Sequence, residues 1–463
     1  MAAVVEASRY RDYAFPLAIA VSSGLGAAAS RSPSAALIAI ACMAAAPILW
    51  CAFAAPVRWP LLFCAAAILS PPVSIGGFQA HPAIIVAAAG VLGGLANLNR
   101  WSIRSTALNF SLGAVLASSG MSLGFAALYS GWLIAAGSAA RWLLLAAAIY
   151  VYFTSSQGPG HRHAAQADTT ARWLFWIALA AALFGCIDFL YQLPAPAGFG
   201  AQFIWLDSGV YRRAQGFFYD ASALGNLCAL FVVMSVAALM SKKILPRPVS
   251  ALGLVVFLAA LLLSYSRGAL GAAAIGCLAL LLLDCKTWGK RRIVIAVATL
   301  VAITGAAFAL VLPEFASTYI ARFSFSSGAG ATPERFFSGR LETWRAAAAF
   351  LAAHPWELVF GIGYKTLPYT RHLGRPLIAD NMYLSTLMET GLFGLLALLA
   401  LNIAILRAGF RGARRGSFFG KWIFCFWLGE MFHMFLADVL TFWRVLPVFF
   451  WVLAQVMNED TPG

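Results

Sequence analysis

Arginines that could bind an anion stand out in this chain. Arg267 lies in a tight turn between two apolar runs, with no acidic residue within ten positions. Arg212 and Arg213 form an adjacent pair, and Arg340 and Arg345 share a predicted helix. Arginine keeps its charge and presents a planar fork of donors that fits phosphate oxygens. These five side chains predict a diphosphate site, with contact to lipid headgroups or snorkelling to the membrane surface as the alternative.

Polar residues beside a later apolar run could supply acid–base chemistry. Asp380 and Asn381 immediately precede this run, and either could cap its helix. Asp380 could instead orient or deprotonate a hydroxyl group, kept ionised by the helix dipole. His372 is a second candidate base, and Asn381 is expected to cap the helix or contact an acceptor. Glu389 lies deeper in the run and must face the protein interior or a polar cavity.

The composition indicates which elements hold these residues. Hydrophobic residues make up 62% of the 463, charged residues 11%, and mean hydropathy is +0.83, whereas a soluble domain is roughly one-quarter charged. The expected fold class is all-α: a polytopic integral membrane protein with about 12 transmembrane helices (range 12 to 14) and a large non-cytoplasmic loop containing short helices. Apolar runs long enough to span a bilayer lie near 14–30, 34–55, 59–75, 82–98, 106–129, 132–153, 173–192, 220–240, 249–266, 268–284, 293–312, 382–404, 421–436 and 443–456.

Clusters of lysine and arginine orient the chain. They lie at 242–247, 286–292 and 407–421. Such clusters mark cytoplasmic loops, which also places both termini in the cytoplasm, and the sequence shows no cleaved signal peptide. By alternation, segments 193–219 and 313–381 lie on the opposite face. The chain therefore divides into four segments: N-terminal transmembrane helices (1–172), central transmembrane helices with non-cytoplasmic arginine segments (173–312), a large non-cytoplasmic loop (313–381) and C-terminal transmembrane helices (382–463).

The segment 313–381 is about 70 residues long, which is long for a plain connection and suggests function. Within it, residues 338–355 predict an amphipathic helix that Ser338 caps and Pro355 ends. Its apolar face consists of Leu341, Trp344, Ala348 and Leu351. Near the C-terminus, a structural network is expected from Glu430, His433, Asp438 and Arg444.

Missing motifs narrow the chemistry. The sequence has no P-loop motif, which argues against an ATP-driven pump, and no non-cytoplasmic DxD motif to hold a divalent cation on a diphosphate. Its eight cysteines show no metal-ligand spacing. We therefore expect no metal site and no cofactor, with arginines neutralising any bound diphosphate.

Four stretches together resemble the O-antigen ligase and polymerase superfamily, and its ligases (WaaL-like) in particular. They are SYSRGALGA (264–272), SGRLETWRAA (338–347), HPWELVFGIGY (354–364) and DNMYLSTLMETGLFG (380–394). The last matches the ligase pattern of a polar residue, nine residues and GxxG, here Asn381, Gly391 and Gly394. Many members have a histidine directly before this asparagine, where this chain has Asp380, so Asp380 or His372 would have to serve as the base.

The resemblance implies a glycosyltransferase of lipopolysaccharide biosynthesis in the bacterial inner membrane. Its donor would be undecaprenyl-diphosphate-linked polysaccharide and its acceptor lipid A-core, joined by inverting, metal-independent transfer at the periplasmic face. Arg267 and the two arginine pairs would bind the diphosphate, Arg267 also assisting catalysis; no nucleic acid is involved. An O-antigen polymerase or a protein O-oligosaccharyltransferase is the alternative. A lipid-linked glycan transporter is less favoured, because the sequence shows no inverted repeat.

Overall fold

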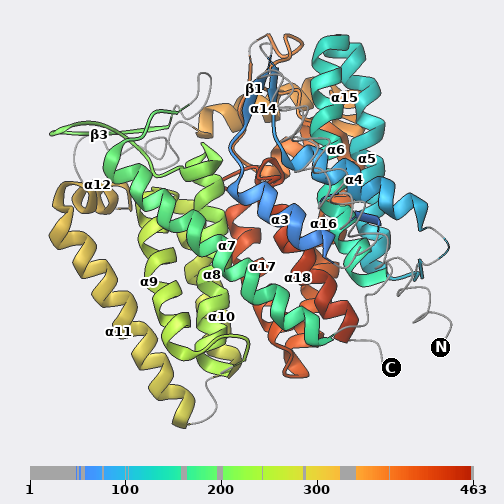
Figure 1. Ribbon diagram of the computed structural model, residues 1–463. Coiled ribbons are helices and arrows are strands. Elements are labelled where there is room, and N and C mark those ends of the chain that lie inside the picture. The colour runs from blue at the N-terminus through green and yellow to red at the C-terminus, as the bar shows by residue number, and fades with distance from the viewer. Residues whose placement is uncertain are drawn as a thin grey trace, which may run out of the picture.

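The apolar runs of the sequence form helices that pack side by side in the computed structural model (Figure 1). The structure describes residues 48, 52–53, 58–75, 78–97, 99, 101–102, 104–157, 164–195, 202–241, 243–284, 288–323, 340–374 and 376–459. The predicted run 14–30 and most of 34–55 lie outside these residues. The helices of the N-terminal half are α3 (Trp59–Leu69), α4 (Ala83–Ala96), α5 (Ala107–Ser130), α6 (Trp132–Gln157), α7 (Ala164–Tyr191) and α8 (Ala221–Ser241).

The C-terminal half continues the same pattern. Its helices are α9 (Arg247–Leu263), α10 (Arg267–Asp284), α11 (Trp288–Val311), α12 (Pro313–Phe323), α14 (Arg340–Ala353), α15 (Pro355–Phe360), α16 (Met382–Arg414), α17 (Phe418–His433) and α18 (Leu446–Glu459). Each predicted apolar run from residue 59 onward overlaps one of the helices.

Five of the described helices are long and apolar enough to cross a membrane: α5, α6, α7, α8 and α16. A sixth is added if α11 and α12, which bend by 115° at their junction, count as one span. Shorter apolar helices include α3, α4, α9 and α10. The chain is thus a nearly all-α polytopic membrane protein, while the expected count of about 12 spans is not confirmed.

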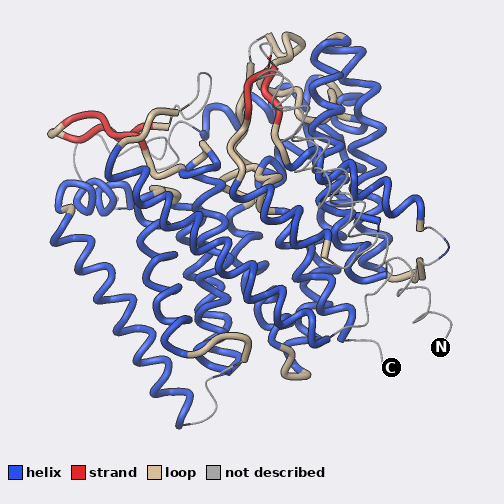
Figure 2. The backbone as a smooth tube through the Cα atoms, viewed as in Figure 1, coloured by secondary structure: helices blue, strands red, loops and turns tan. Residues whose placement is uncertain are grey.

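Two strand hairpins interrupt the helices, and the sequence analysis did not predict them. β1 (Val73–Ile75) pairs antiparallel with β2 (Phe78–Ala80), and β3 (Phe203–Leu206) pairs antiparallel with β4 (Gly209–Arg212). Both lie at the end of the bundle that also carries α12 and α14 (Figure 2). Loops and short elements therefore gather at one end of the helices.

Packing joins the two halves of the chain. α5 packs against α16 and α6 against α18, and within the C-terminal half α10 packs against α17. The last pair approaches closely because small residues face each other: a Cβ added at Gly429 would lie 2.0 Å from the carbonyl oxygen of Ala272. α8 is enclosed by its neighbours, and nearly all its side chains are buried. N-terminal and C-terminal helices thus form one core.

The helix α16 is broken at Gly391, whose φ of 70° and ψ of −167° are not helical. The break frees backbone carbonyls inside the bundle, and these need hydrogen-bond donors. The N–H of Ile362 donates to the carbonyl of Met388 at 2.9 Å, and the N–H of Gly363 donates to that of Glu389 at 3.0 Å. The loop after α15 is therefore fastened to the broken helix.

Candidate active site

A cavity of about 770 Å³ lies among the loops and helix ends that these contacts hold together. Its walls come from α6, the segment before α8, α14, the loop between α15 and α16, α16 itself, and the segment between α17 and α18. Its charged lining residues are Arg141, Arg340, Lys365, Arg444, Asp220, Asp380, Glu389 and Asp438. Positive and negative side chains are equal in number, so the formal charges of the lining balance.

The start of α16 separates two neighbouring polar residues. The side chain of Asn381 accepts a hydrogen bond from the N–H of Leu384 at 3.1 Å and so caps the helix. Asp380 has a φ of 44°, a left-handed conformation that aspartate tolerates better than most residues. Its carboxylate lines the cavity, and its side chain is 46% exposed. The sequence allowed either residue to cap the helix, and the structure shows that Asn381 does so.

Arg340 is the cationic partner of Asp380. Its Nε lies 3.1 Å from the Asp380 Oδ2 atom, and both side chains line the cavity. Arg340 is the first residue of α14, and the indole N–H of Trp344, one turn later, donates to the carbonyl of Ala379 at 2.7 Å. This contact holds the start of α14 against the segment before α16. It therefore helps to keep Arg340, at the start of α14, next to Asp380.

The predicted helix 338–355 corresponds to α14, but its buried face differs from the expected one. The structure buries Ala347 and Leu351, whereas Ala348 is exposed. Ser338, the expected cap, lies outside the described residues. Pro355 ends the predicted helix and begins α15. The buried face is thus shifted by one residue, because α14 packs on α15 and α16.

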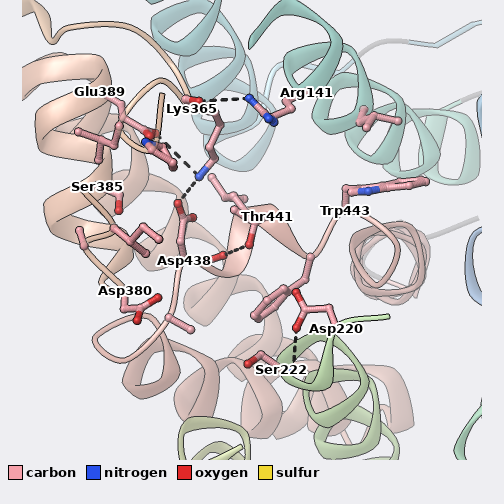
Figure 3. A pocket seen from close by; sticks show the side chains of 18 of the residues that line it. Arg141, Asp220, Ser222, Lys365, Asp380, Ser385, Glu389, Asp438, Thr441 and Trp443 are labelled. Carbon is pink, nitrogen blue, oxygen red and sulfur yellow. Dashed lines mark hydrogen bonds and ion pairs between the residues drawn. The ribbon is translucent and has the colours of Figure 1, made fainter. Parts of the chain in front are cut away.

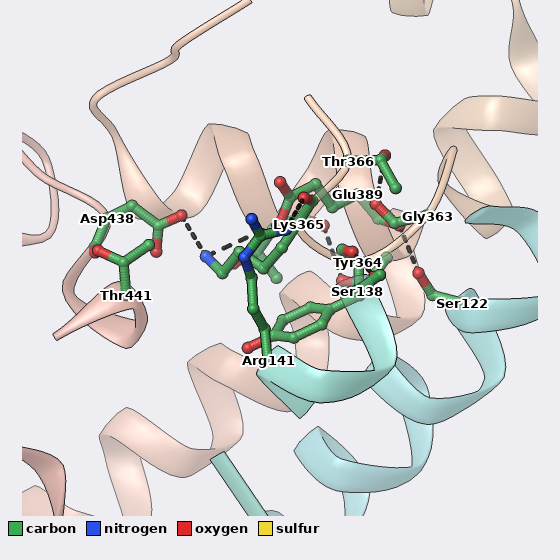
Figure 4. A network of polar contacts seen from close by, with 12 residues as sticks. Ser122, Ser138, Arg141, Gly363, Tyr364, Lys365, Thr366, Glu389, Asp438 and Thr441 are labelled. Atoms are coloured by element: carbon green, nitrogen blue, oxygen red, sulfur yellow. Dashed lines mark hydrogen bonds and ion pairs between the residues drawn. The ribbon is translucent and has the colours of Figure 1, made fainter. Parts of the chain in front are cut away.

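Lys365 lies between two carboxylates (Figure 4). Its Nζ donates a hydrogen bond to Asp438 and lies 3.9 Å from the Glu389 Oε2 atom. Only 8% of the residue is exposed. Burial by itself would lower the pKa of Lys365, but the charges of Asp438 and Glu389 outweigh burial and raise this pKa above its ordinary value. The ammonium group therefore stays charged inside the protein.

The polar residues that were expected to form one network near the C-terminus divide into three groups. Asp438 pairs with Lys365 at the cavity. Glu430 accepts from the Asn226 amide at 2.5 Å, and His433 lies 3.4 Å from Glu430, both buried. The third group is Arg444, whose guanidinium donates to the carbonyls of Ala67, Ile68 and Ser70 at the end of α3. A cation there complements the helix dipole.

The other predicted diphosphate ligands lie away from the cavity lining. Arg212 pairs with Asp188 at 2.5 Å, and the Nε of Arg213 donates to the carbonyl of Ser264 at 2.7 Å. Arg267 is half-buried at the start of α10, and Arg345 is exposed on α14. Of the five predicted arginines, the cavity lining includes Arg340. A role for the other four in binding a diphosphate stays a prediction.

Packing around Arg267 follows the expectation that its neighbouring glycines pack closely. A Cβ added at Gly268 would lie 2.4 Å from the ring of His433, and one added at Gly271 would lie 2.5 Å from the ring of Phe432. The turn that carries Arg267 is therefore pressed against α17.

His372 also lies outside the lining of the cavity. Its Nε2 is 3.3 Å from the Glu357 Oε1 atom, and its ring centroid is 4.4 Å from that of Tyr129. Asp380 rather than His372 therefore faces the space in which a substrate could lie. A role for His372 as the base stays a prediction.

Sequence reasoning missed three charged residues of the cavity. Arg141 was hidden inside the apolar run 132–153, Asp220 preceded another run, and Lys365 was one of several cations in the long loop. An arginine inside an apolar run is itself a signal of function in a membrane protein. Among the described residues, no group of three or more His, Cys, Asp or Glu side chains is placed to hold a metal ion.

Comparison with known families connects this site to a chemistry. Residues 252–399 match the family model described as O-antigen ligase. The matched segment includes Arg340, Lys365, Asp380 and Glu389, whereas Arg141 lies outside it. A search of curated proteins found no match. This matched segment extends across the broken helix and the Asp380 side of the cavity, so residues 252–399 carry an O-antigen ligase superfamily domain.

Proposed function

We propose that the protein is an O-antigen ligase of lipopolysaccharide biosynthesis. It transfers polysaccharide from undecaprenyl diphosphate to a hydroxyl group of lipid A-core at the periplasmic face of the bacterial inner membrane. The observation that carries this proposal is the position of Asp380. Inside the segment that matches the O-antigen ligase family, its carboxylate faces a cavity of about 770 Å³ beside the guanidinium of Arg340.

The reaction assigns a separate task to each of these groups. The acceptor hydroxyl oxygen attacks the anomeric carbon of the donor sugar, while the bond from that carbon to the diphosphate breaks and its electron pair leaves with the diphosphate. Asp380 orients the hydroxyl group and accepts its proton. Attack from the side opposite the leaving group inverts the configuration of the anomeric carbon.

Arg340 can stabilise the leaving diphosphate while it stays paired with Asp380. A guanidinium has five N–H donors, and the contact between its Nε and Asp380 uses one of them. Donors directed at the oxygens on which negative charge develops lower the energy of the transition state. A single arginine can thus hold the base in place and assist departure of the diphosphate.

The glycans that cells make with and without this protein test the proposal. Mass analysis of lipopolysaccharide should show that polymer is lost from lipid A-core while full-length polymer remains on undecaprenyl diphosphate. Loss of the long lipid-linked polymer itself would instead indicate a polymerase. Loss of glycan from protein would indicate a protein O-oligosaccharyltransferase, and lipid-linked polymer trapped at the cytoplasmic face would indicate a transporter.

Metal dependence provides a separate prediction. Because arginines rather than a divalent cation are proposed to neutralise the diphosphate, the purified protein should keep its transfer activity in EDTA. The measurement is the transfer rate before and after chelation, with magnesium or manganese added back. An absolute requirement for either ion would contradict the arginine mechanism.

A further inference from the structure

Arg141 lies deep in a helix that is apolar enough to cross a membrane. It is nine residues into α6 (Trp132–Gln157), which corresponds to roughly 13 Å along the helix axis. The residue is half-buried and lines the cavity. An arginine at such a depth is costly and is usually paired with an acid or used for function.

The contacts of Arg141 are with neutral groups. Its Nη1 donates to the carbonyl of Lys365 at 3.3 Å, and its Nη2 donates to the hydroxyl of Tyr369 at 2.8 Å. Its guanidinium carbon lies 4.7 Å from the centroid of the Tyr369 ring. Within the described part of the chain, no carboxylate lies within ion-pairing distance of Arg141.

The other cations of the cavity are already engaged. Arg340 pairs with Asp380, Lys365 pairs with Asp438 and Glu389, and Arg444 donates to backbone carbonyls. A ligand that carries a negative charge would share Arg340 or Lys365 with the carboxylates already paired there, or displace them. At Arg141 it would displace none of the described carboxylates.

We propose that Arg141 and Tyr369 form a subsite for an anionic group, phosphate or carboxylate, carried by a saccharide. The two contacts of Arg141 use two of its five N–H donors, so three remain for a ligand. The Tyr369 hydroxyl accepts from Arg141 and is therefore left to donate its own hydrogen. Tyr369 is 50% exposed, and its ring, like that of Trp443, lines the cavity and offers an apolar face to the C–H groups of a sugar.

The position of Arg141 indicates that the anion bound there is a substituent on a sugar rather than the reacting diphosphate. Arg141 and Asp380 lie on different sides of the cavity, with Lys365 and Asp438 between them (Figure 3). This step rests on the proposed function, in which Asp380 marks the position of the reacting hydroxyl group and Arg340 that of the diphosphate. An anion at Arg141 then belongs to a neighbouring part of the donor or acceptor glycan.

Transfer kinetics with charged and neutralised substrates test the subsite. One arm uses lipid A-core with its sugar phosphates and the same acceptor after removal of phosphate by hydrogen fluoride. The other uses a lipid-linked glycan that contains uronic acid and the same donor after carboxyl reduction. The arm in which neutralisation raises the KM of the wild type identifies the source of the anion.

Arg141→Gln should raise the KM for the charged substrate by about 10- to 100-fold, which corresponds to about 1.4–2.8 kcal/mol, because it removes a hydrogen bond to a charged group. It should leave kcat within about threefold and the KM for the neutralised substrate nearly unchanged. Tyr369→Phe should give a smaller change in the same direction. Arg411→Gln makes the same chemical change at an exposed arginine near the C-terminal end of α16, and this control variant should behave like the wild type.

Binding measured without turnover separates this subsite from the proposed function. Isothermal titration would use the phosphorylated core oligosaccharide and the acidic donor glycan, each freed from its lipid, and their neutralised forms. Weaker binding of a charged form to Arg141→Gln supports the subsite even if no transfer occurs. Equal binding of charged and neutralised forms by the wild type overturns the subsite, even if transfer is normal or the Arg141 variant does not fold.

Discussion

The backbone at Asp380 directs two adjacent polar side chains to different places. Asn381 is extended, with a φ of −152°, and caps α16, whereas Asp380 has a φ of 44° and its carboxylate meets Arg340 at the cavity. Asparagine has nearly the same shape as aspartate and also tolerates the left-handed region. A change of Asp380 to asparagine therefore tests the charge and leaves the cap in place.

Asp380→Asn should lower the transfer rate at saturating substrate by roughly 10²-fold or more, because the variant lacks a general base. Its thermal unfolding temperature and its donor binding should stay close to those of the wild type. Asp168→Asn, the same change at an exposed position of α7, provides the matched control. A near-normal rate for Asp380→Asn would move the role of base to His372 or leave the reaction without one.

The buried charge of Lys365 gives a prediction about stability. Lys365→Met leaves Asp438 and Glu389 without their shared cation, and loss of one partner from a buried ion pair costs about 3–5 kcal/mol. Thermal unfolding in detergent should show this loss. A further change of Asp438→Asn should recover part of it, because one of the two unpaired charges is removed. An additional loss in the double variant would contradict the ion-pair explanation.

The pH dependence of this effect follows from the pKa of Lys365. Because that pKa is raised in the folded protein, the stabilisation from the charged ammonium is fully present below the unfolded-state pKa of 10.5 and is lost as the pH rises through the folded-state pKa. Lys365 should therefore stay charged between pH 7 and 9. Its titration should not change the difference in unfolding free energy between wild type and Lys365→Met in this range. A decline of that difference within this range would contradict the assigned charge.

At the scale of an element, the break in α16 links the membrane helix to the loop that carries Lys365. A Cβ added at Gly391 would lie 2.1 Å from the carbonyl oxygen of Val359, at a backbone φ that disfavours L-residues. The hydroxyl of Ser122 on α5 also donates to the carbonyl of Glu389, at 2.7 Å. The contacts among α5, α16 and the loop after α15 thus depend on the conformation of this glycine.

Gly391→Ala should destabilise the protein by more than about 2 kcal/mol, because a φ of 70° with a ψ of −167° is nearly restricted to glycine. With a Cβ this conformation alone costs about 1–3 kcal/mol, and the clash adds to this cost. The measurement is thermal unfolding together with the yield of folded protein in detergent. Gly113→Ala is the matched control, since a Cβ at this exposed position of α5 meets nothing within 4 Å. Similar losses of stability in both variants would show that the break at Gly391 is not the cause of the destabilisation.

At the scale of the whole molecule, the loops that build the cavity gather at one end of the helix bundle. Both strand hairpins, α12 and α14 lie at that end (Figure 1). The distribution of lysine and arginine predicts that this end is non-cytoplasmic. That orientation decides whether the cavity can meet a periplasmic acceptor.

Cysteine labelling tests the orientation. Ala348→Cys, exposed on α14, should react with a membrane-impermeant thiol reagent in intact spheroplasts, whereas Arg411→Cys, exposed near the other end of α16, should react only after lysis. The wild-type protein, with its own cysteines, gives the background. The reverse pattern would invert the predicted topology and place the cavity at the cytoplasmic face.

The sequence by itself determined the positions of the apolar helices and the resemblance to the O-antigen ligase superfamily. A bilayer requires long apolar segments, so hydropathy alone locates them, and the runs predicted from residue 59 onward overlap helices of the structure. The resemblance to this superfamily could be recognised in SYSRGALGA and DNMYLSTLMETGLFG because these motifs are local. Asp380 and Arg340 were recognisable as candidate residues for the same reason.

Only the tertiary structure decided which charged groups meet. Lys365 and Asp438 are 73 residues apart, and Arg141 and Tyr369 are 228 residues apart. Arg212, which is predicted as a diphosphate ligand, also pairs with Asp188 in the preceding helix α7. Local patterns carry no information about such pairings, because the partners are selected by how helices pack in three dimensions. The two hairpins were missed for a related reason, since strands of three or four residues are too short to show a reliable alternation.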